Sequence, residues 1–385
     1  MALSKYLHDE ITEIHVLSHN EGSGLSNKET ECAKNIVVHR LFDSTDAIKK
    51  NFAFIKIFFA IYRLHPNLVH FEYSPIPKGK YGGLIGETLL LLFFLLKLKR
   101  IPFFVTLHSI WLSDQAESRL FELIGNRIIS KLAWYYFMMV MHFFGAMPKK
   151  LLLLVAKTDP EIIKIFSKTY KIPTSKLREE LHGIWWEDNK ELSGNSKQKS
   201  RKIVCLGVIR PSKGYEYTIM AMRAVVNEIP DASLIIAGIA ISDEGREYVK
   251  KLRRLVKEYS LDESVLIEER YLSDSEFSEY VRTAGVVVLP YIRVLGASSI
   301  LSSALSYRVP VILSSSGPFF QRLSDILPMI SPVDHEALAQ KIVHILGSEE
   351  YFTELVQKYQ RYASDHDWSV VVKGIYNEFL NSIEH

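Results

Sequence analysis

The sequence has little cysteine and almost no excess charge. Its 385 residues include two cysteines, and 47 lysine and arginine residues nearly balance 44 aspartate and glutamate residues, which leaves a net charge of +3. The cysteines, Cys32 and Cys205, lie far apart, which argues against a disulfide framework and fits a reducing compartment. Nucleic-acid-binding domains usually concentrate basic residues in a patch or stripe, so this composition indicates no nucleic-acid partner.

The sequence also lacks a signal peptide and an uninterrupted membrane span. Its N-terminal segment has no charged stretch followed by an apolar run. The apolar runs 84–99 and 132–147 are interrupted by Glu87 and Lys97 or by His142, and each falls short of the ~18 apolar residues that suggest a span. We therefore expect a cytoplasmic protein whose apolar runs are either buried helices or helices resting on the cytoplasmic face of a membrane.

The sequence does contain a regular alternation of short apolar runs with helical patterns. Hydrophobic residues make up 48% of the chain, which is ample for a globular core. The alternation predicts an α/β fold with parallel sheets and right-handed crossovers. The runs expected to form strands are residues 14–18, 35–41, 68–73, 103–108 and 151–157, then 202–207, 233–238, 264–269, 285–291 and 309–315.

The helical patterns and one polar stretch divide the chain. Residues 184–201 are polar and aperiodic, which marks a domain boundary. We expect an N-terminal domain over 1–185, a linker over 186–201, a C-terminal domain over 202–365 and a terminal helical segment over 366–385. The predicted helices cover residues 84–98, 132–144, 215–229, 247–259, 273–284 with a Ser273–Glu276 capping box, 297–308, 335–346 with Asp334 as N-cap, and 368–383.

Two cations follow the first strand of the second half. Arg210 and Lys213 lie just after Gly207 and just before a predicted helix. Cationic side chains beside helix N–H groups can hold the phosphates of a ligand. The stretch is not a P-loop, because no Gly-Lys-Ser/Thr follows a glycine-spaced run. The alternative is a solvated loop with two ordinary surface charges.

A serine-rich helix is predicted over residues 297–308. Helical periodicity places its apolar residues on one face and its serines on the other. Gly296 and Ala297 leave the first-turn N–H groups open to a pyrophosphate, which the helix dipole favours. The alternative is that the small residues only permit close packing of helix and sheet. The apolar face holds Ile300, Leu301, Ala304 and Leu305, and the polar face holds Ser298, Ser299, Ser302, Ser303 and Ser306.

These stretches resemble the donor half of glycosyltransferase family four (group 1). The similar segments are LGVIRPSKG, SLIIAG, GVVVLPY, GASSILSSALSYRVPVI and SSSGPF, followed by the tail YASDHDWSVVVKGIYNEFL. The resemblance is weaker in the first half, at PNLVHFEYSP, IPFFVTLHSIW and LHGIW. It implies a retaining enzyme with the GT-B fold: two Rossmann-like, doubly wound parallel-sheet domains facing a cleft, and a C-terminal helix that crosses back to the first domain.

The resemblance also implies roles for particular residues. Arg210 and Lys213 would bind the donor diphosphate, and Tyr271 and Leu272 would lie against the nucleotide base. His108 would lie near the transferred sugar, although a hydrogen-bonded core histidine is the alternative. No metal and no cofactor beyond the nucleotide-sugar co-substrate is implied; the DHD sequence at 365–367 is expected in a polar turn rather than at a metal. The remaining donor contacts would come from Gly296, Ala297, Ser298, Ser299 and Ser303.

The chain departs from the family in three places. Relatives usually carry two glutamates where Leu295 and Ser303 stand, and often a third where Gln321 stands. Serine can still hydrogen-bond a hydroxyl, though more weakly than a carboxylate. The resemblance further implies that the family's first strand and glycine-rich loop would precede Met1. Either the start is misassigned or the domain lacks that strand, which would expose a sheet edge.

The leading hypothesis is a retaining hexosyltransferase that uses a nucleotide-sugar donor. Its acceptor would be a glycan, a lipid-linked molecule or a small molecule bound by the first domain. Basic residues flank the two apolar runs, so these runs either contact an anionic membrane or are buried crossover helices. The alternatives are a non-catalytic GT-B protein that binds a nucleotide, a glycan or a partner glycosyltransferase, and a GT-B epimerase. The flanking residues are Lys97, Lys99, Arg100, Lys149 and Lys150.

Overall fold

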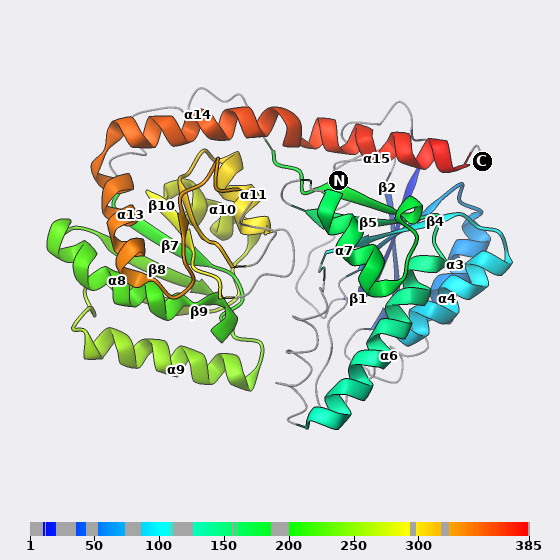
Figure 1. Cartoon of the computed structure of the whole chain (residues 1–385), viewed down its shortest axis with the longest axis horizontal. Helices are drawn as coiled ribbons and strands as arrows, with labels where there is room; N and C mark the ends of the chain where they lie inside the picture. Colours follow the sequence, from blue (N-terminus) through cyan, green and yellow to red (C-terminus); the bar gives the residue numbers. More distant parts are fainter. Residues whose placement is uncertain are drawn as a thin grey trace. The chain divides into compact units, whose positions relative to one another are not determined.

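The structure is a computed structural model that describes residues 11, 13–20, 36–43, 53–73, 86–108, 110, 126–155, 158, 160–185, 200–292, 298–316 and 323–383. The chain forms two compact units and passes between them twice (Figure 1). The first unit comprises Met1–Leu181 and Ser369–His385, and the second comprises His182–Trp368. Every strand pair within the described residues is parallel, which confirms the α/β prediction.

The second unit is built on a six-stranded sheet. Its order is β12-β11-β10-β7-β8-β9. Runs of valine, isoleucine and leucine form its central strands because these strands are covered by helices on both faces and need apolar residues throughout. All four residues of β10 and all four of β11 are buried. The strands are β7 (Lys202–Leu206), β8 (Ser233–Gly238), β9 (Val265–Glu269), β10 (Val286–Leu289), β11 (Val311–Ser314) and β12 (Met329–Ile330).

The helices of the second unit follow the predicted pattern with one addition. The capping box of Ser273 and Glu276 is present, and the Ala337 N–H donates to the Asp334 carboxylate at 2.9 Å, so both predicted caps are confirmed. Helix α14 was not predicted. The prediction of a polar turn at 365–367 was wrong, because residues 365 and 366 are the last two residues of this helix. The helices are α8 (Tyr215–Glu228), α9 (Asp243–Glu258), α10 (Asp274–Thr283), α11 (Ser299–Ser306), α13 (His335–Gly347) and α14 (Glu349–His366).

The strands described in the first unit form two separate sheets. β1 (Ile14–Asn20) pairs with β2 (Ile36–Asp43), and β3 (Val69–Tyr73), β4 (Phe103–Leu107), β5 (Lys150–Val155) and β6 (Leu177–Leu181) form the other sheet in that order. Within the described ranges, no strand joins β1 to β3. β6 escaped prediction because its sequence, LREEL, carries three charged residues in five.

Helices cover both faces of the four-stranded sheet. Alternate residues of a strand point to opposite faces. Phe71 and Phe103 contact Phe93 of α4 (Gly86–Leu98), and Tyr73 stacks on Phe144 of α6 (Arg127–Ala146). On the opposite face, Phe104 and Leu152 pack against Phe379 of α15 (Trp368–Ile383). The described parts of the two predicted apolar helices, residues 86–98 and 132–144, are helical, as predicted.

Two further helices are described in the first unit, and neither was predicted. α3 (Ala53–Leu64) packs beside α4, and α7 (Pro160–Tyr170) packs on α6, where Tyr170 contacts Trp134 and Phe137. Among the described residues, no helix combines the length and apolar composition needed to cross a membrane.

The second passage between the units returns the chain to the first one, as the family resemblance implied. The Trp368 N–H donates to the Ile184 carbonyl at 3.0 Å, and the Ile184 N–H donates to the His366 carbonyl at 2.8 Å. Gly183 lies under the indole of Trp368, where an added Cβ would come within 2.3 Å of the ring. Residues 186–199 of the expected linker lie outside the described residues.

Candidate functional site

The carboxyl edge of the six-stranded sheet contains the change in strand order that favours ligand binding. β8 and β9 follow β7 to one side, whereas β10 and β11 lie on its other side. Ligands of open parallel sheets bind at the carboxyl ends of the strands where the strand order reverses. The loops after β7 and β10 meet at this reversal of strand order, the switch point of the sheet. Residues in these loops are therefore the first candidates for a binding site.

The loop after β7 is held in place by backbone contacts. Its residues Pro211–Lys213 form one turn of 3-10 helix, and Gly214 follows with a φ of 66°. A Cβ on Gly214 would lie 2.2 Å from the carbonyl oxygen of Pro290, so only glycine allows this approach to the end of β10. The Ile292 N–H donates to the Ser212 carbonyl at 3.0 Å. The two loops at the switch point are thus fixed to each other.

This loop presents the two predicted cations. Arg210 is exposed and extended, with a φ of −158°. The Nζ of Lys213 lies 3.8 Å from the centre of the Tyr291 ring, which orients the ammonium group through a cation–π contact. Both side chains come from one short loop that immediately precedes α8. The structure therefore brings the two cations together beside a helix N-terminus.

The acidic residue in the first turn of α8 is directed into the protein. Glu216 is buried, accepts a hydrogen bond from the Tyr248 hydroxyl and pairs with Lys251 at 3.0 Å. Burial, reinforced by the Glu216 carboxylate, raises the pKa of Tyr248 far above its ordinary value. The Glu216 charge is therefore compensated by residues of α9.

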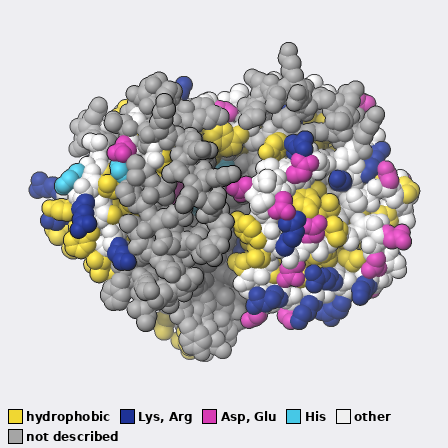
Figure 2. Space-filling view, turned by 180° about the vertical axis from the view of Figure 1, so that it is seen from behind, with side chains coloured by type: hydrophobic (Ala, Val, Ile, Leu, Met, Phe, Trp, Pro, Cys, Tyr) yellow, Lys and Arg dark blue, Asp and Glu magenta, His cyan; other side chains and the backbone are white. Residues whose placement is uncertain are grey.

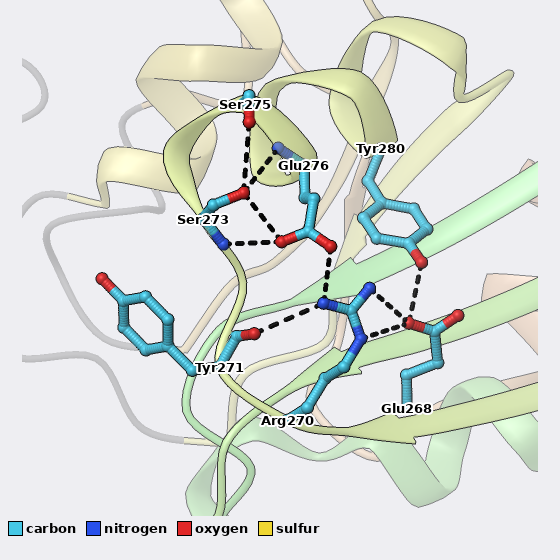
Figure 3. Close-up of polar contacts among 7 residues, drawn as sticks. All are labelled: Glu268, Arg270, Tyr271, Ser273, Ser275, Glu276 and Tyr280. Carbon is cyan, nitrogen blue, oxygen red and sulfur yellow. Dashed lines mark hydrogen bonds and ion pairs between the residues drawn. The ribbon is translucent and has the colours of Figure 1, made fainter. Parts of the chain in front are cut away.

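A polar network supports the segment after β9 (Figure 3). Arg270 pairs with Glu268 at 3.1 Å and with Glu276 at 2.7 Å, and it donates to the Tyr271 carbonyl at 3.4 Å. Hydrogen bonds from the Ser273 N–H and hydroxyl, and from Arg270, lower the pKa of Glu276 to about 2. The network holds the backbone while the Tyr271 ring points away from it and remains 74% exposed. Leu272 is half-buried.

The apolar face predicted for helix α11 is buried, and the serines of its other face differ in their contacts. Its four predicted apolar residues are buried, and the Ser298 hydroxyl caps the helix by accepting from the Leu301 N–H. The Ser302 hydroxyl contacts His182 Nδ1 at 2.7 Å, and the Ser306 hydroxyl accepts from the Trp185 N–H at 3.0 Å. Part of the serine face therefore contacts residues 182–185. Ser299 is exposed and Ser298 and Ser303 are half-buried, whereas Gly296, Ala297, Leu295 and Gln321 lie outside the described residues.

A second polar group lies at the carboxyl edge of the sheet in the first unit. His108, which follows β4, contacts the Glu72 carboxylate of β3 through Nε2 at 2.6 Å. His70 Nε2 lies 2.7 Å from the Thr106 hydroxyl and 3.6 Å from Glu72 Oε1. Burial lowers the pKa of His70, the Glu72 charge opposes this and the His108 charge adds to it. Glu72 therefore lies between two imidazoles.

Sequence reasoning selected His108 but missed Glu72 and His70. The signal was present in the alternation of the strands, because His70, Glu72 and Thr106 are even-numbered residues of paired strands, and His108 continues this alternation after β4. They share the sheet face that also carries Phe104. Burial would raise the pKa of Glu72, but the hydrogen bond to His108 and the charges of His70 and His108 outweigh it, so the net shift is downward.

The predicted site residues that the structure describes belong to two different units. Arg210, Lys213, Tyr271, Leu272 and the serines of α11 follow β7, β9 and β10 of the second unit. His108 belongs to the first unit. Among the residues that the structure describes, no cluster of three or more His, Cys, Asp or Glu side chains is arranged to hold a metal ion.

Solved structures share the fold of this chain at low sequence identity. A glycosyltransferase from Rickettsia africae aligns over 100% of this chain and 94% of its own, with a TM-score of 0.67 and 13% identity. Sucrose-phosphate synthase from Thermosynechococcus elongatus aligns over 98% of this chain and 91% of its own, with a TM-score of 0.68 and 16% identity. HepE from Anabaena aligns over 96% of this chain and 100% of its own, with a TM-score of 0.66 and 12% identity.

These likenesses extend over both units, which identifies the fold as GT-B. A search of curated protein sequences gave no match. Residues 187–366 match the family model described as glycosyl transferases group 1. This region includes the loop after β7, the Arg270 network and α11. Through this region, which is just under half of the chain, the sequence is similar to the group 1 glycosyltransferases.

Proposed function

We propose that the chain transfers a hexosyl group from a nucleotide-sugar donor to a glycan, lipid-linked or small-molecule acceptor with retention of anomeric configuration. The match of residues 187–366 to the group 1 family model supports sugar transfer. The Anabaena relative was solved with UDP and with UDP-glucose, which supports a nucleoside diphosphate-sugar as donor. No metal or cofactor is required in this proposal.

The observation that carries the proposal is the pair of cations at the switch point. Arg210 and Lys213 lie in a fixed loop between the ends of β7 and β10. The bond between the anomeric carbon and the diphosphate oxygen breaks, while the acceptor hydroxyl oxygen bonds to that carbon and its proton leaves with the diphosphate. Charge therefore grows on the diphosphate, where two preorganised cations stabilise it most.

The other donor contacts would come from the segments that follow β9 and β10. Tyr271 and Leu272 would lie against the base, and Ser298, Ser299 and Ser303 would hydrogen-bond the phosphates or ribose together with the backbone of Gly296 and Ala297. Ile239 and Ile241, which follow the intervening strand β8, are exposed apolar side chains. Exposed apolar residues beside cations suit a ligand that has both a flat base and a charged diphosphate. His108 would act near the transferred sugar.

One observation favours the alternative of a GT-B protein that binds a nucleotide without transferring sugar. Where family members usually present a glutamate, this chain has Ser303 on α11. A hydroxyl holds a ribose or sugar less strongly than a carboxylate does. Binding and transfer therefore need separate measurements.

A thermal-shift series with nucleoside diphosphates and nucleotide sugars tests donor binding. A ligand at about 100 times its Kd adds roughly 2.7 kcal/mol to the unfolding free energy. Arg210→Ala and Lys213→Ala should each lose this gain, whereas Arg254→Ala, an exposed charge on α9, should keep it. Unchanged shifts in the first two variants would contradict the donor site. Release of nucleoside diphosphate from a stabilising sugar nucleotide then distinguishes transfer from binding alone.

A further inference from the structure

We infer that the outer side of α3, α4 and α6 docks on an anionic lipid bilayer. The three helices form one layer on the first unit, with α4 between the other two (Figure 1). Phe93 and Phe144 point from this layer into the sheet. The side chains on the opposite side of each helix therefore face solvent, and together they form one surface, the outer helix face.

The outer helix face is apolar along the whole of α6. Ile128, Leu132, Tyr135, Met139 and Phe143 are exposed and recur every three or four residues, so they form one stripe. Ile128 is 74% exposed and Leu132 is 64% exposed. The buried residues of the same helix, among them Trp134, Phe137 and Phe144, lie on its other side. The helix is thus apolar on both sides, which a globular core alone does not require.

The stripe continues on the two neighbouring helices. In α4, Leu91, Phe94 and Leu98 are exposed at the same helical spacing, with Leu98 66% exposed. In α3, Phe59 and Tyr62 are exposed one turn apart. Single exposed apolar residues are ordinary, but a continuous apolar surface marks a place of contact with a partner or a membrane.

Charge identifies the partner. The sequences of α3, α4 and α6 contain five basic residues and one acidic residue, Glu87. Two further basic residues follow α4, and the Nζ of Lys99 lies 5.4 Å from the centre of the Tyr62 ring. Figure 2 shows basic and hydrophobic side chains next to one another at the left edge of the first unit. The exposed basic residues include Lys56, Arg63, Lys97, Lys99, Arg100 and Lys131.

This combination fits a bilayer surface better than a second copy of the chain. A symmetric dimer would place the same surface against itself and bring the basic residues of both copies together. A bilayer with anionic lipids attracts those residues instead, and helices with apolar and basic side chains lie in its interface at a depth of about 5–10 Å. Tyrosine side chains, as in Tyr62 and Tyr135, are enriched at such interfaces.

Docking in this way leaves the exposed Glu72–His108 pair accessible. Glu72 lies on the face opposite to Phe71 and Tyr73, which contact α4 and α6. The outer helix face and the Glu72–His108 pair therefore belong to different sides of the first unit. Docking through the outer helix face does not depend on donor binding by the second unit.

Flotation of the full chain with lipid vesicles tests the inference. Binding is expected to vesicles that contain about a third phosphatidylglycerol, with clear weakening in pure phosphatidylcholine and at high salt. The triple variant Phe59→Ser, Phe94→Ser, Leu132→Ser removes one exposed apolar residue from each helix. It should lower the vesicle-bound fraction at least about tenfold.

A matched variant controls for loss of exposed apolar surface in general. Leu266→Ser, Val333→Ser, Val370→Ser removes three similarly exposed residues elsewhere and should bind vesicles like the unmodified chain. Circular dichroism and the thermal midpoint verify that both variants fold. Absence of binding to anionic vesicles, or equal binding by the two triple variants, would overturn the inference. So would a dimer in analytical ultracentrifugation that only the Phe59, Phe94 and Leu132 changes dissociate, if vesicle binding is absent.

Discussion

The Glu72 carboxylate contacts the His108 imidazole at 2.6 Å while its other oxygen lies 3.6 Å from His70. The first contact joins the end of β3 to the residue that follows β4. A carboxylate in this position selects the tautomer of the imidazole and restricts its orientation. Glu72 therefore acts as a positioning residue if His108 lies near the transferred sugar.

Glu72→Gln is expected to lower the rate of sugar transfer about tenfold without changing the affinity for UDP. The amide keeps a hydrogen bond to His108, but unlike the carboxylate it can donate as well as accept, so it no longer selects one tautomer of the imidazole. The measurements are kcat from nucleoside diphosphate release, its pH profile and calorimetric UDP affinity.

The chain offers a matched control for this variant. Glu13 and His15 also form a carboxylate–imidazole pair in the first unit, at 2.9 Å. Glu13→Gln should leave both the rate and its pH profile unchanged. Equal effects of the two substitutions would show that Glu72 has only a general structural role.

Ser303→Glu is expected to tighten UDP binding several-fold. The family resemblance places a ribose-binding carboxylate at this position of α11, and a charge-assisted hydrogen bond is roughly twice as strong as a neutral one. Ser302→Glu is the control, because its hydroxyl contacts His182 instead. Calorimetry with UDP and with its 2′,3′-dideoxyribose analogue would measure the gain. A gain that persists without the ribose hydroxyls contradicts the assigned contact.

Gly238→Ala is expected to destabilise the second unit by at least about 3 kcal/mol. Gly238 has a φ of 151°, and an added Cβ would lie 1.9 Å from the carbonyl oxygen of Gly207, the residue that follows β7. Backbone atoms cannot yield as a flexible side chain can. At Gly347 a Cβ meets no atom within 4 Å, so Gly347→Ala should change the unfolding free energy little. Chemical denaturation of both variants provides the comparison.

Glu180→Gln is expected to stabilise the first unit in alkaline but not in acidic solution. Burial raises the pKa of Glu180 from 4.5 to about 7, and the charge of Glu378 adds to this, whereas Arg178 and a backbone N–H oppose it. The folded state therefore loses stability as pH rises from about 4.5 to 7, and remains less stable above that range. Removing this charge should increase the unfolding free energy by up to roughly 3 kcal/mol near pH 8.5 and by little near pH 5.

Glu378→Gln should have the opposite sign. Burial would raise the pKa of Glu378, but hydrogen bonds from Lys150 and Arg178 outweigh it, and the pKa is lowered. Its contribution to stability is present above pH 4.5 and lost as pH falls through the lowered pKa. Near pH 8.5, the denaturation midpoint should therefore rise in Glu180→Gln and fall in Glu378→Gln, relative to the unmodified chain. A shift of both midpoints in the same direction would contradict the assigned charges.

Much of the fold was predictable because its core strands are buried on both faces. Strands such as β7, β8 and β10 must be apolar throughout, which distinguishes them from the amphipathic helices between them. Local chemistry also determined the caps at Ser273 and Asp334, since a cap depends on residues three positions apart. β6 was missed because Arg178 is paired with Glu378, a residue 200 positions away.

The sequence by itself determined the alternation of the buried strands with most of the helices, the cation pair in the loop after β7 and the two faces of α11. Each depends on neighbours in the chain. Only the tertiary structure decided which serines of α11 contact residues 182–185, that Glu72 contacts His108, and that α3, α4 and α6 combine their exposed residues into one surface. These relationships join segments distant in sequence, and their register comes from strand pairing and helix packing, which local patterns do not specify.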